Sequence, residues 1–193
     1  MKYIIGITGG IATGKSTVSN YLINQQFKVV DCDKLTAQSY IDCFDEIKAF
    51  FPDCIVNGEI SRPLLSKRVF SSEKDKSTLE KIIHPYVRNK MLQEIKKCEK
   101  GLMFLDIPLL YEAHMEDLCD EIWVVYIDEQ LQLERLMKRN QMEKETAKLR
   151  IHSQLSIEEK KKKADVVINN QTTLQALYQQ IEKRLGELDE YIN

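Results

Sequence analysis

The sequence predicts an α/β fold with a five-stranded parallel sheet flanked by helices. Three observations support this prediction. Short apolar runs rich in Val, Ile and Leu recur along the chain without polar alternation, as in strands buried on both faces. Segments with helical spacing separate these runs, which is the order expected for a parallel sheet. The first run, turn, helix and second run fit within about 33 residues, the size of a βαβ unit. The five expected strands cover residues 3–8, 27–30, 102–107, 122–127 and 165–168.

The first unit begins with the β-branched run from Tyr3 to Thr8 and continues through a glycine-containing turn. Apolar residues at 18, 21 and 22 then predict a helix over 15–26. The second strand ends at Asp31-Cys32-Asp33.

The region from about 34 to 100 has apolar residues at spacings of three and four, so we expect a mostly helical subdomain with a loop around 52–58. His84-Pro85 is either a substrate contact or a bend where a helix begins, and the residues alone favour the bend.

The charged segment from 130 to 163 is also helical in pattern, and Lys160–Lys163 reads as a solvated helix end. An amphipathic helix over about 174–188 closes the chain. We therefore expect a single domain over 1–193, with a core of about 1–33, 101–130 and 164–193, a helical subdomain of about 34–100, and a further helical segment of about 131–163.

Composition narrows the class of protein. The 193 residues contain 43% hydrophobic and 30% charged residues, ordinary values for one globular domain. The net charge of -2 argues against a nucleic-acid binder. Five cysteines without a CxxC pair argue against a disulfide framework or a zinc site, and favour reduced, mostly buried thiols. No run approaches the roughly 18 apolar residues of a membrane span. The apolar start is too short for a signal peptide, so we expect a cytoplasmic protein.

The segment from Gly9 to Ser16 matches GxxxxGK[ST], the Walker A or P-loop motif, without deviation. Glycines let backbone N–H groups approach a polyphosphate closely, and the helix that follows adds the positive end of its dipole. Lys15 can reach the β- and γ-phosphates, and the Ser16 hydroxyl can bind Mg²⁺. The expected ATP contacts are Gly10, Ile11, Ala12, Thr13, Gly14, Lys15, Ser16 and Thr17.

The motif is shared by switch GTPases, motors and small-molecule kinases. No NKxD sequence for guanine selection occurs, and the strand ending at Asp106 continues with Ile107-Pro108 rather than with a glutamate. These features favour a kinase that transfers the γ-phosphate of ATP to a hydroxyl group.

Asp33 lies beyond the second strand, at the sheet edge where open α/β folds bind ligands. Its carboxylate either orients and deprotonates the acceptor hydroxyl or caps the next helix, and position alone does not decide between them. Asp31 is the weaker candidate. Asp106 either lies in the Mg²⁺ shell or holds its loop by hydrogen bonds.

Arginines in the charged segment can clamp the migrating phosphoryl group on a closing lid. The alternative is a solvated face with ion pairs such as Glu134 with Lys138. For any single arginine the two interpretations are balanced, and for the whole segment the lid is favoured. The arginines are Arg135, Arg139 and Arg150.

Several blocks, in this order and spacing, resemble the dephospho-coenzyme A kinase family over almost the whole chain. They are residues 7–11, 30–33, 58–62, 69–70, 79–85, 106–112, 132–136, 150–154, 159–160 and 164–169. The resemblance implies transfer of the ATP γ-phosphate to the ribose 3′-hydroxyl of dephospho-CoA, giving CoA and ADP. It also implies a nucleotide-binding α/β core with a helical substrate domain and a lid. The partners would be ATP with Mg²⁺ and dephospho-CoA, with no nucleic acid and no membrane, in a monomer or weak homo-oligomer.

The resemblance also assigns roles. Asp33 would be the catalytic aspartate, beside Lys15 and the lid residue Arg139, and Asn169 would lie near the adenine. The acceptor substrate would be bound by Thr8, Asp33, Arg62, His84, Asp106, Pro108, Leu109 and Leu110. The chain departs from the usual family pattern at Thr13, Cys32 and Ser61, and the last of these affects how Arg62 is held.

Overall fold

The computed structural model describes residues 1–188 of the chain. The chain forms two compact units, one of residues 1–31 together with residues from 94 onward, and one of residues 32–93. The finer division into core, substrate subdomain and lid stays a prediction.

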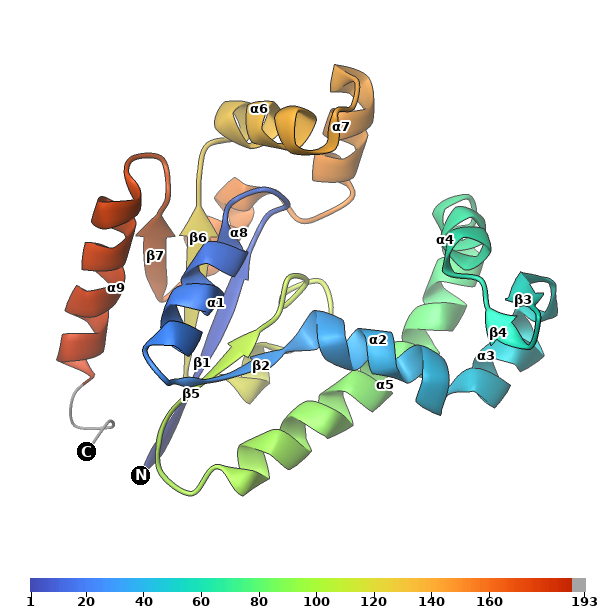
Figure 1. Cartoon of the computed structure of the whole chain (residues 1–193), viewed down its shortest axis with the longest axis horizontal. Coiled ribbons are helices and arrows are strands. Elements are labelled where there is room, and N and C mark those ends of the chain that lie inside the picture. Colours follow the sequence, from blue (N-terminus) through green and yellow to red (C-terminus); the bar gives the residue numbers. More distant parts are fainter. Residues whose placement is uncertain (189–193) are drawn as a thin grey trace. The chain divides into compact units, whose positions relative to one another are not determined.

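The first unit contains a five-stranded parallel sheet in the order β2-β5-β1-β6-β7 (Figure 1). Its strands are β1 (Lys2–Gly9), β2 (Lys28–Asp31), β5 (Gly101–Asp106), β6 (Glu121–Tyr126) and β7 (Val166–Asn169). The α/β prediction with five parallel strands is therefore confirmed. β1 lies at the centre between β5 and β6, so the loop that follows it emerges from the middle of the sheet.

Helices α1 (Lys15–Asn24) and α9 (Leu174–Glu187) pack beside the sheet (Figure 1). Their apolar faces enter one buried cluster with the strands. The rings of Phe104 and Trp123 meet edge to face in this cluster, with centroids 5.5 Å apart. The cluster fixes the sheet and α1 as one rigid base for the loop between them.

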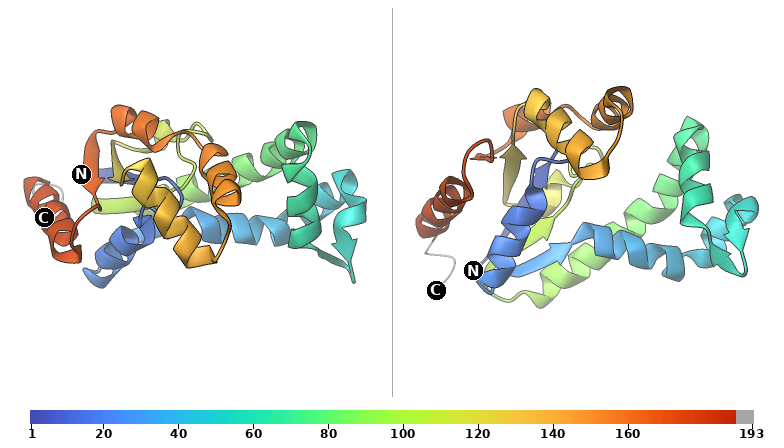
Figure 2. Two further views of the ribbon diagram at one scale, coloured as in Figure 1. Left: turned by 90° about the horizontal axis from the view of Figure 1, so that it is seen from above. Right: turned by 45° about the horizontal axis from the view of Figure 1, so that its top comes forward.

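The charged segment forms α6 (Glu129–Asn140), α7 (Lys144–His152) and α8 (Ile157–Lys163). Asp128 caps α6 by accepting a hydrogen bond from Leu131 N at 2.8 Å, and Ser156 caps α8 by accepting one from Glu159 N. Helices α6 and α7 lie side by side in both views of Figure 2. They share a small apolar cluster of Leu136, Ala147 and Ile151, against which Ile11 and Ala12 of the glycine-containing turn pack.

The second unit contains α2 (Cys32–Asp42), α3 (Phe44–Phe50), the 3₁₀ turn η1 (Pro52–Cys54), α4 (Arg62–Phe70) and most of α5 (Glu73–Lys97). The expected loop around 52–58 contains η1 and the start of an antiparallel hairpin, β3 (Ile55–Val56) with β4 (Glu59–Ile60). Asn57 and Gly58 form its turn with φ angles of 52° and 81°. Asn-Gly is the sequence signal for such a turn.

Pro85 lies inside α5, not where a helix begins, so the expected bend at a helix start is wrong. Proline removes one helical hydrogen bond, but Leu79, Ile83, Val87 and Met91 form a buried stripe on both sides of it. Burial of this stripe keeps the helix continuous.

Within the described residues no disulfide joins the five cysteines, of which Cys43 and Cys54 are buried and three are half-buried. Burial raises the pKa of Cys43, Cys54 and Cys119, which makes these thiols less reactive. Within residues 1–188, no helix combines the length and the apolar character needed to cross a bilayer.

Candidate active site

The Walker A segment connects β1 to α1, as the motif predicts. Gly14 has a φ of 91°, a left-handed conformation that favours glycine. A Cβ at Gly14 would lie 2.1 Å from Asn170 Nδ2, which donates a hydrogen bond to Thr13 O at 2.8 Å. The backbone angle therefore favours glycine here, and a Cβ would also displace the Asn170 side chain that packs against the loop.

Thr13 stabilises the same loop from inside. It is fully buried, and its hydroxyl donates to Gly10 O at 2.9 Å. Threonine at this position thus closes the turn with its own side chain, so the departure from the usual family residue has a defined structural role.

Lys15 forms an ion pair with Asp106, the last residue of β5. The other oxygen of the Asp106 carboxylate accepts a hydrogen bond from Ser19 Oγ at 2.5 Å. Asp106 is only 7% exposed, so both contacts form away from bulk water, where electrostatic interactions are stronger. The sequence left open whether Asp106 binds metal or holds a loop, and here it holds the lysine.

The loop after β5 follows the same edge of the sheet. Thr8 is fully buried and its hydroxyl donates to Pro108 O at 3.1 Å. Leu110 is also fully buried, whereas Leu109 is 41% exposed. Thr8 and Leu110 therefore shape this loop from inside, and Leu109 presents its side chain outward. Tyr111, which follows Leu110, is also buried, and burial raises the pKa of its hydroxyl to about 12.

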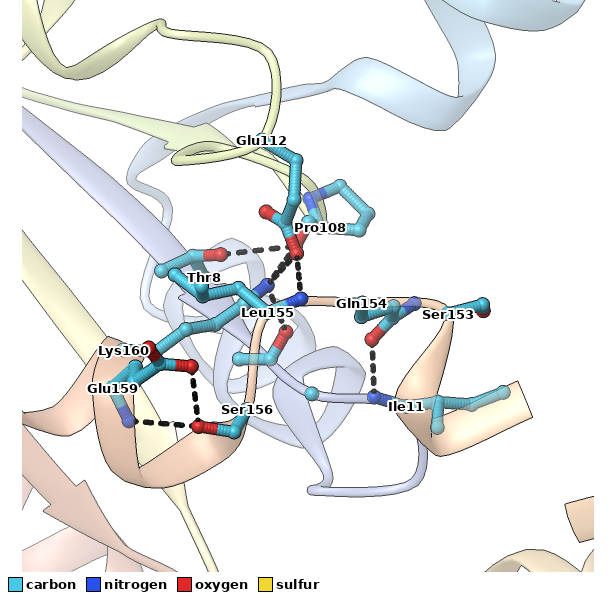
Figure 3. A network of polar contacts seen from close by, with 12 residues as sticks. Thr8, Ile11, Pro108, Glu112, Ser153, Gln154, Leu155, Ser156, Glu159 and Lys160 are labelled. Atoms are coloured by element: carbon cyan, nitrogen blue, oxygen red, sulfur yellow. Dashed lines mark hydrogen bonds and ion pairs between the residues drawn. The ribbon is translucent and has the colours of Figure 1, made fainter. Parts of the chain in front are cut away.

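Lys160 contradicts the expectation of a solvated helix end, because its side chain has no exposed surface. Its Nζ donates to Gly9 O at 3.3 Å and to Pro108 O at 3.0 Å, and lies 2.9 Å from Glu112 Oε1 (Figure 3). Burial lowers the pKa of Lys160, while the hydrogen bond to Glu112 raises it. Lys161 is half-buried, and Lys162 and Lys163 are exposed, so the expectation holds for the end of the run.

Two glutamine side chains bind the main chain of Ile11, near the start of the phosphate loop. Ile11 N donates to Gln154 Oε1 at 3.0 Å, and Gln132 Nε2 donates to Ile11 O at 2.8 Å. The sequence places both residues within blocks of family resemblance but predicts no contact for either. The sequence assigns no role to Asn170, which lies two residues beyond the last expected strand.

The arginines of α6 and α7 differ in their surroundings. Arg135 is half-buried and its Nη2 donates to Asn170 O at 3.0 Å, which links α6 to the residue that contacts the phosphate loop. Arg139 and Arg150 are exposed, and Arg139 Nε donates to Asn140 Oδ1 at 2.9 Å. Asn169 ends β7, and its main chain is bound by Gln180 of α9.

Three of the predicted site residues belong to the second unit. Asp33 is exposed in the first turn of α2. Arg62 begins α4, where its Nη2 donates to Ala37 O at 3.2 Å and its guanidinium lies 4.9 Å from the ring centroid of Tyr40. His84 is half-buried in α5. Their predicted roles toward a substrate stay predictions.

Comparisons with known proteins agree with this geometry. The family model for dephospho-CoA kinase matches residues 3–176. The chain belongs to the dephospho-CoA kinase family. A dephospho-CoA kinase of Staphylococcus epidermidis is 42% identical over 194 residues, covering 97% of this chain and 96% of the relative. One of Enterococcus faecalis is 40% identical over 194 residues, covering 97% and 98%.

Two solved structures are similar along the whole chain. A Thermus thermophilus protein has a TM-score of 0.87 and 35% identity, and covers 97% of this chain and 98% of its own. A dephospho-CoA kinase from Campylobacter jejuni has a TM-score of 0.77 and 31% identity, and covers 98% of each chain. The chain is therefore a kinase of the family that catalyses the final step of coenzyme A synthesis.

Proposed function

We propose that this chain transfers the γ-phosphate of ATP to the ribose 3′-hydroxyl of dephospho-CoA, giving CoA and ADP. The proposal is carried by the Walker A loop, whose Lys15 is paired with Asp106 at the end of β5. The match of residues 3–176 to the family model for dephospho-CoA kinase supports it. Backbone N–H groups of residues 10–17 would bind the phosphates, and Lys15 would move from Asp106 to the β- and γ-phosphates when ATP enters.

The residues at the start of α1 and the end of β5 fit a bound Mg²⁺. Ser16 is exposed in the first turn of α1, and the Asp106 carboxylate lies beside the neighbouring Lys15. Hydroxyl and carboxylate oxygens are the hard ligands that Mg²⁺ prefers, together with water and phosphate oxygens. Ser16 would bind the ion directly, and Asp106 would bind it directly or through water. When bound, the ion would offset the charge that develops on the transferred group.

Asp33 is our candidate for the group that accepts the proton of the acceptor hydroxyl. It follows Asp31, the last residue of β2, by two residues, so chain geometry keeps their Cα atoms within about 7 Å. Asp31 is in register with Asp106 on the adjacent strand. The family resemblance around residues 30–33 supports the same choice.

Other residues would recognise and enclose the substrates. Leu109 and Pro108, after β5, would contact the acceptor, with Thr8 and Leu110 shaping the loop from inside. Arg62 and His84 would bind the acceptor from the second unit. Arg139, exposed on α6, would clamp the migrating phosphoryl group, and Asn169 would lie near the adenine.

A coupled ADP-release assay with ATP, Mg²⁺ and dephospho-CoA tests the function, with adenosine, AMP and shikimate as parallel acceptors. We expect strong turnover with dephospho-CoA alone. Turnover that prefers another acceptor would refute the substrate, and ADP release that needs no acceptor would refute the kinase reaction. D33N separates the chemical step from ATP binding, because it should lose turnover while binding ATP normally.

A further inference from the structure

We propose that Lys160 is a positioning residue for phosphoryl transfer, which fixes the phosphate loop against the loop of residues 106–112 through its ion pair with Glu112. The reaction named here rests on the proposed function. The positioning itself rests on contacts within the first unit.

The three acceptors around Lys160 match the three N–H donors of an ammonium group. Gly9 O, Pro108 O and Glu112 Oε1 all accept, and none of them can donate in this arrangement. A neutral amine has only two N–H groups, so the full set requires the charged form. The side chain is completely buried, and a charge so placed is stable only when it is paired and hydrogen-bonded.

The acceptors come from two segments far apart in the sequence. Gly9 is the last residue of β1 and begins the phosphate loop, and Pro108 and Glu112 follow Asp106, the partner of Lys15. Glu112 Oε1 also accepts from Leu155 N at 2.9 Å, in the connection between α7 and α8 (Figure 3). One ion pair therefore joins the phosphate loop, the loop after β5 and the end of the charged helical segment.

Lys160 is also tied to the loop that carries the partner of Lys15, because its Nζ donates to Pro108 O, two residues after Asp106. Burial lowers the pKa of Lys160, and the positive charge of Lys15 lowers it further. A shift of Gly9 or Pro108 would move the phosphate-binding amides and the loop after Asp106 relative to each other. Displacements of about 1 Å in such groups cost up to about 10²-fold in rate.

Glu112 depends on Lys160 in return. In the part of the chain that the structure describes, Glu112 Oε2 is buried without a hydrogen-bond partner, so Oε1 carries its contacts. Without Lys160, the Glu112 side chain, which is 24% exposed, would keep one N–H donor on Oε1 beside its unbonded buried Oε2, which destabilises the fold. Loss of stability and loss of positioning must therefore be measured separately.

The test compares K160M, E112Q and the double variant K160M/E112Q with wild type, and uses K162M as the matched control. Lys162 is an exposed lysine on the same helix. Three quantities are measured at a temperature where every variant is folded: the urea midpoint, the Kd of ATP·Mg by calorimetry, and kcat with dephospho-CoA.

We expect K160M to raise the Kd of ATP and lower kcat, each by about 10–100-fold, the size of loss seen when a group that orients a site is removed. The double variant buries no charge here, so its urea midpoint should recover toward wild type while Kd and kcat stay impaired. K162M should match wild type. If K160M does not fold, the double variant supports the same comparison.

Two outcomes would overturn the proposal: a K160M enzyme whose ATP Kd and kcat stay within about twofold of wild type, or a double variant that regains both together with its midpoint. The ATP measurement needs no acceptor. If wild type fails to phosphorylate dephospho-CoA, the proposed substrate is wrong, and the Kd of ATP still decides the role of Lys160.

Discussion

Lys15 of the phosphate loop is paired with Asp106, whose carboxylate also accepts a hydrogen bond from Ser19 of the same helix. The lysine that should meet the ATP phosphates is therefore held in place before they arrive. Asp106 ends β5, the strand next to β1, so the central strands of the sheet determine where Lys15 is held.

The first prediction concerns this pair. K15A should lower kcat by about 10³-fold, because it removes a charged donor aimed at the transferred phosphate. D106N should lower kcat by about 10²-fold, because the lysine loses its charged partner and Mg²⁺ loses a carboxylate. In steady-state assays the double variant should lose little more than K15A, since residues acting on one group are not additive. Fully additive losses would show that the two residues act independently.

The second prediction concerns Asp33. D33N should lower kcat by roughly 10²–10⁴-fold if its carboxylate accepts the acceptor proton. The Kd of ATP, measured by calorimetry, should stay unchanged. D31N is the matched control, since Asp31 ends β2 only two residues earlier, and its loss of kcat should be much smaller. A loss below tenfold in D33N would exclude the role of general base.

The third prediction compares two glycines with similar backbone angles. Gly14 has a φ of 91° and Gly58 one of 81°, so alanine is strained at both by about 1–2 kcal/mol. A Cβ at Gly14 would also collide with Asn170 Nδ2, whereas no atom of the described residues beyond its chain neighbours lies within 4 Å of a Cβ at Gly58. G14A should abolish measurable ATP binding, and G58A should only lower the unfolding midpoint. Normal ATP binding by G14A would contradict the close packing of Asn170 on the phosphate loop.

The strands and the phosphate loop could be predicted because their physical causes are local. Strands buried on both faces need continuous apolar runs, and a loop around phosphate needs glycine at fixed spacing. Lys160 could not be found in this way. A run of four lysines suggests a solvated helix end, and two of the Lys160 partners are main-chain carbonyls, which leave no trace in the sequence.

Other differences between the elements expected from the sequence and those in the structure have causes that single residues do not reveal. Pro85 predicted a helix boundary, but the buried stripe of α5 outweighs one missing hydrogen bond. Asn57-Gly58 did carry a recognisable hairpin signal, and the strands beside it are only two residues long, too short for alternation to be visible. The direction of the Asp33 side chain relative to a substrate cannot be predicted from position, because a capping and a catalytic aspartate occupy the same place in the chain.

The fourth prediction concerns the stability of the sheet. Glu121, 4% exposed, accepts hydrogen bonds from Arg184 Nε at 3.0 Å, from Arg184 Nη2 and from Trp123 Nε1. Burial alone would raise the pKa of this carboxyl, but these donors hold it below its usual value of 4.5. E121Q should lower the free energy of unfolding by about 2–4 kcal/mol at pH 7, because Arg184 loses its buried charged partner.

The pH dependence of this loss follows from the sign of the shift. A carboxyl whose pKa is lower in the folded state stabilises the fold above its unfolded pKa, here near 4.5, and loses this contribution as the pH falls through the folded value. Urea unfolding of wild type and E121Q should therefore differ fully at pH 7 and converge below pH 4.5. E187Q is the control, because Glu187 pairs with the same arginine but is exposed, so its removal should cost about 0–1 kcal/mol. A difference between wild type and E121Q that persists unchanged at pH 3 would mean that the charge of Glu121 contributes nothing, and that its shape alone stabilises the start of β6.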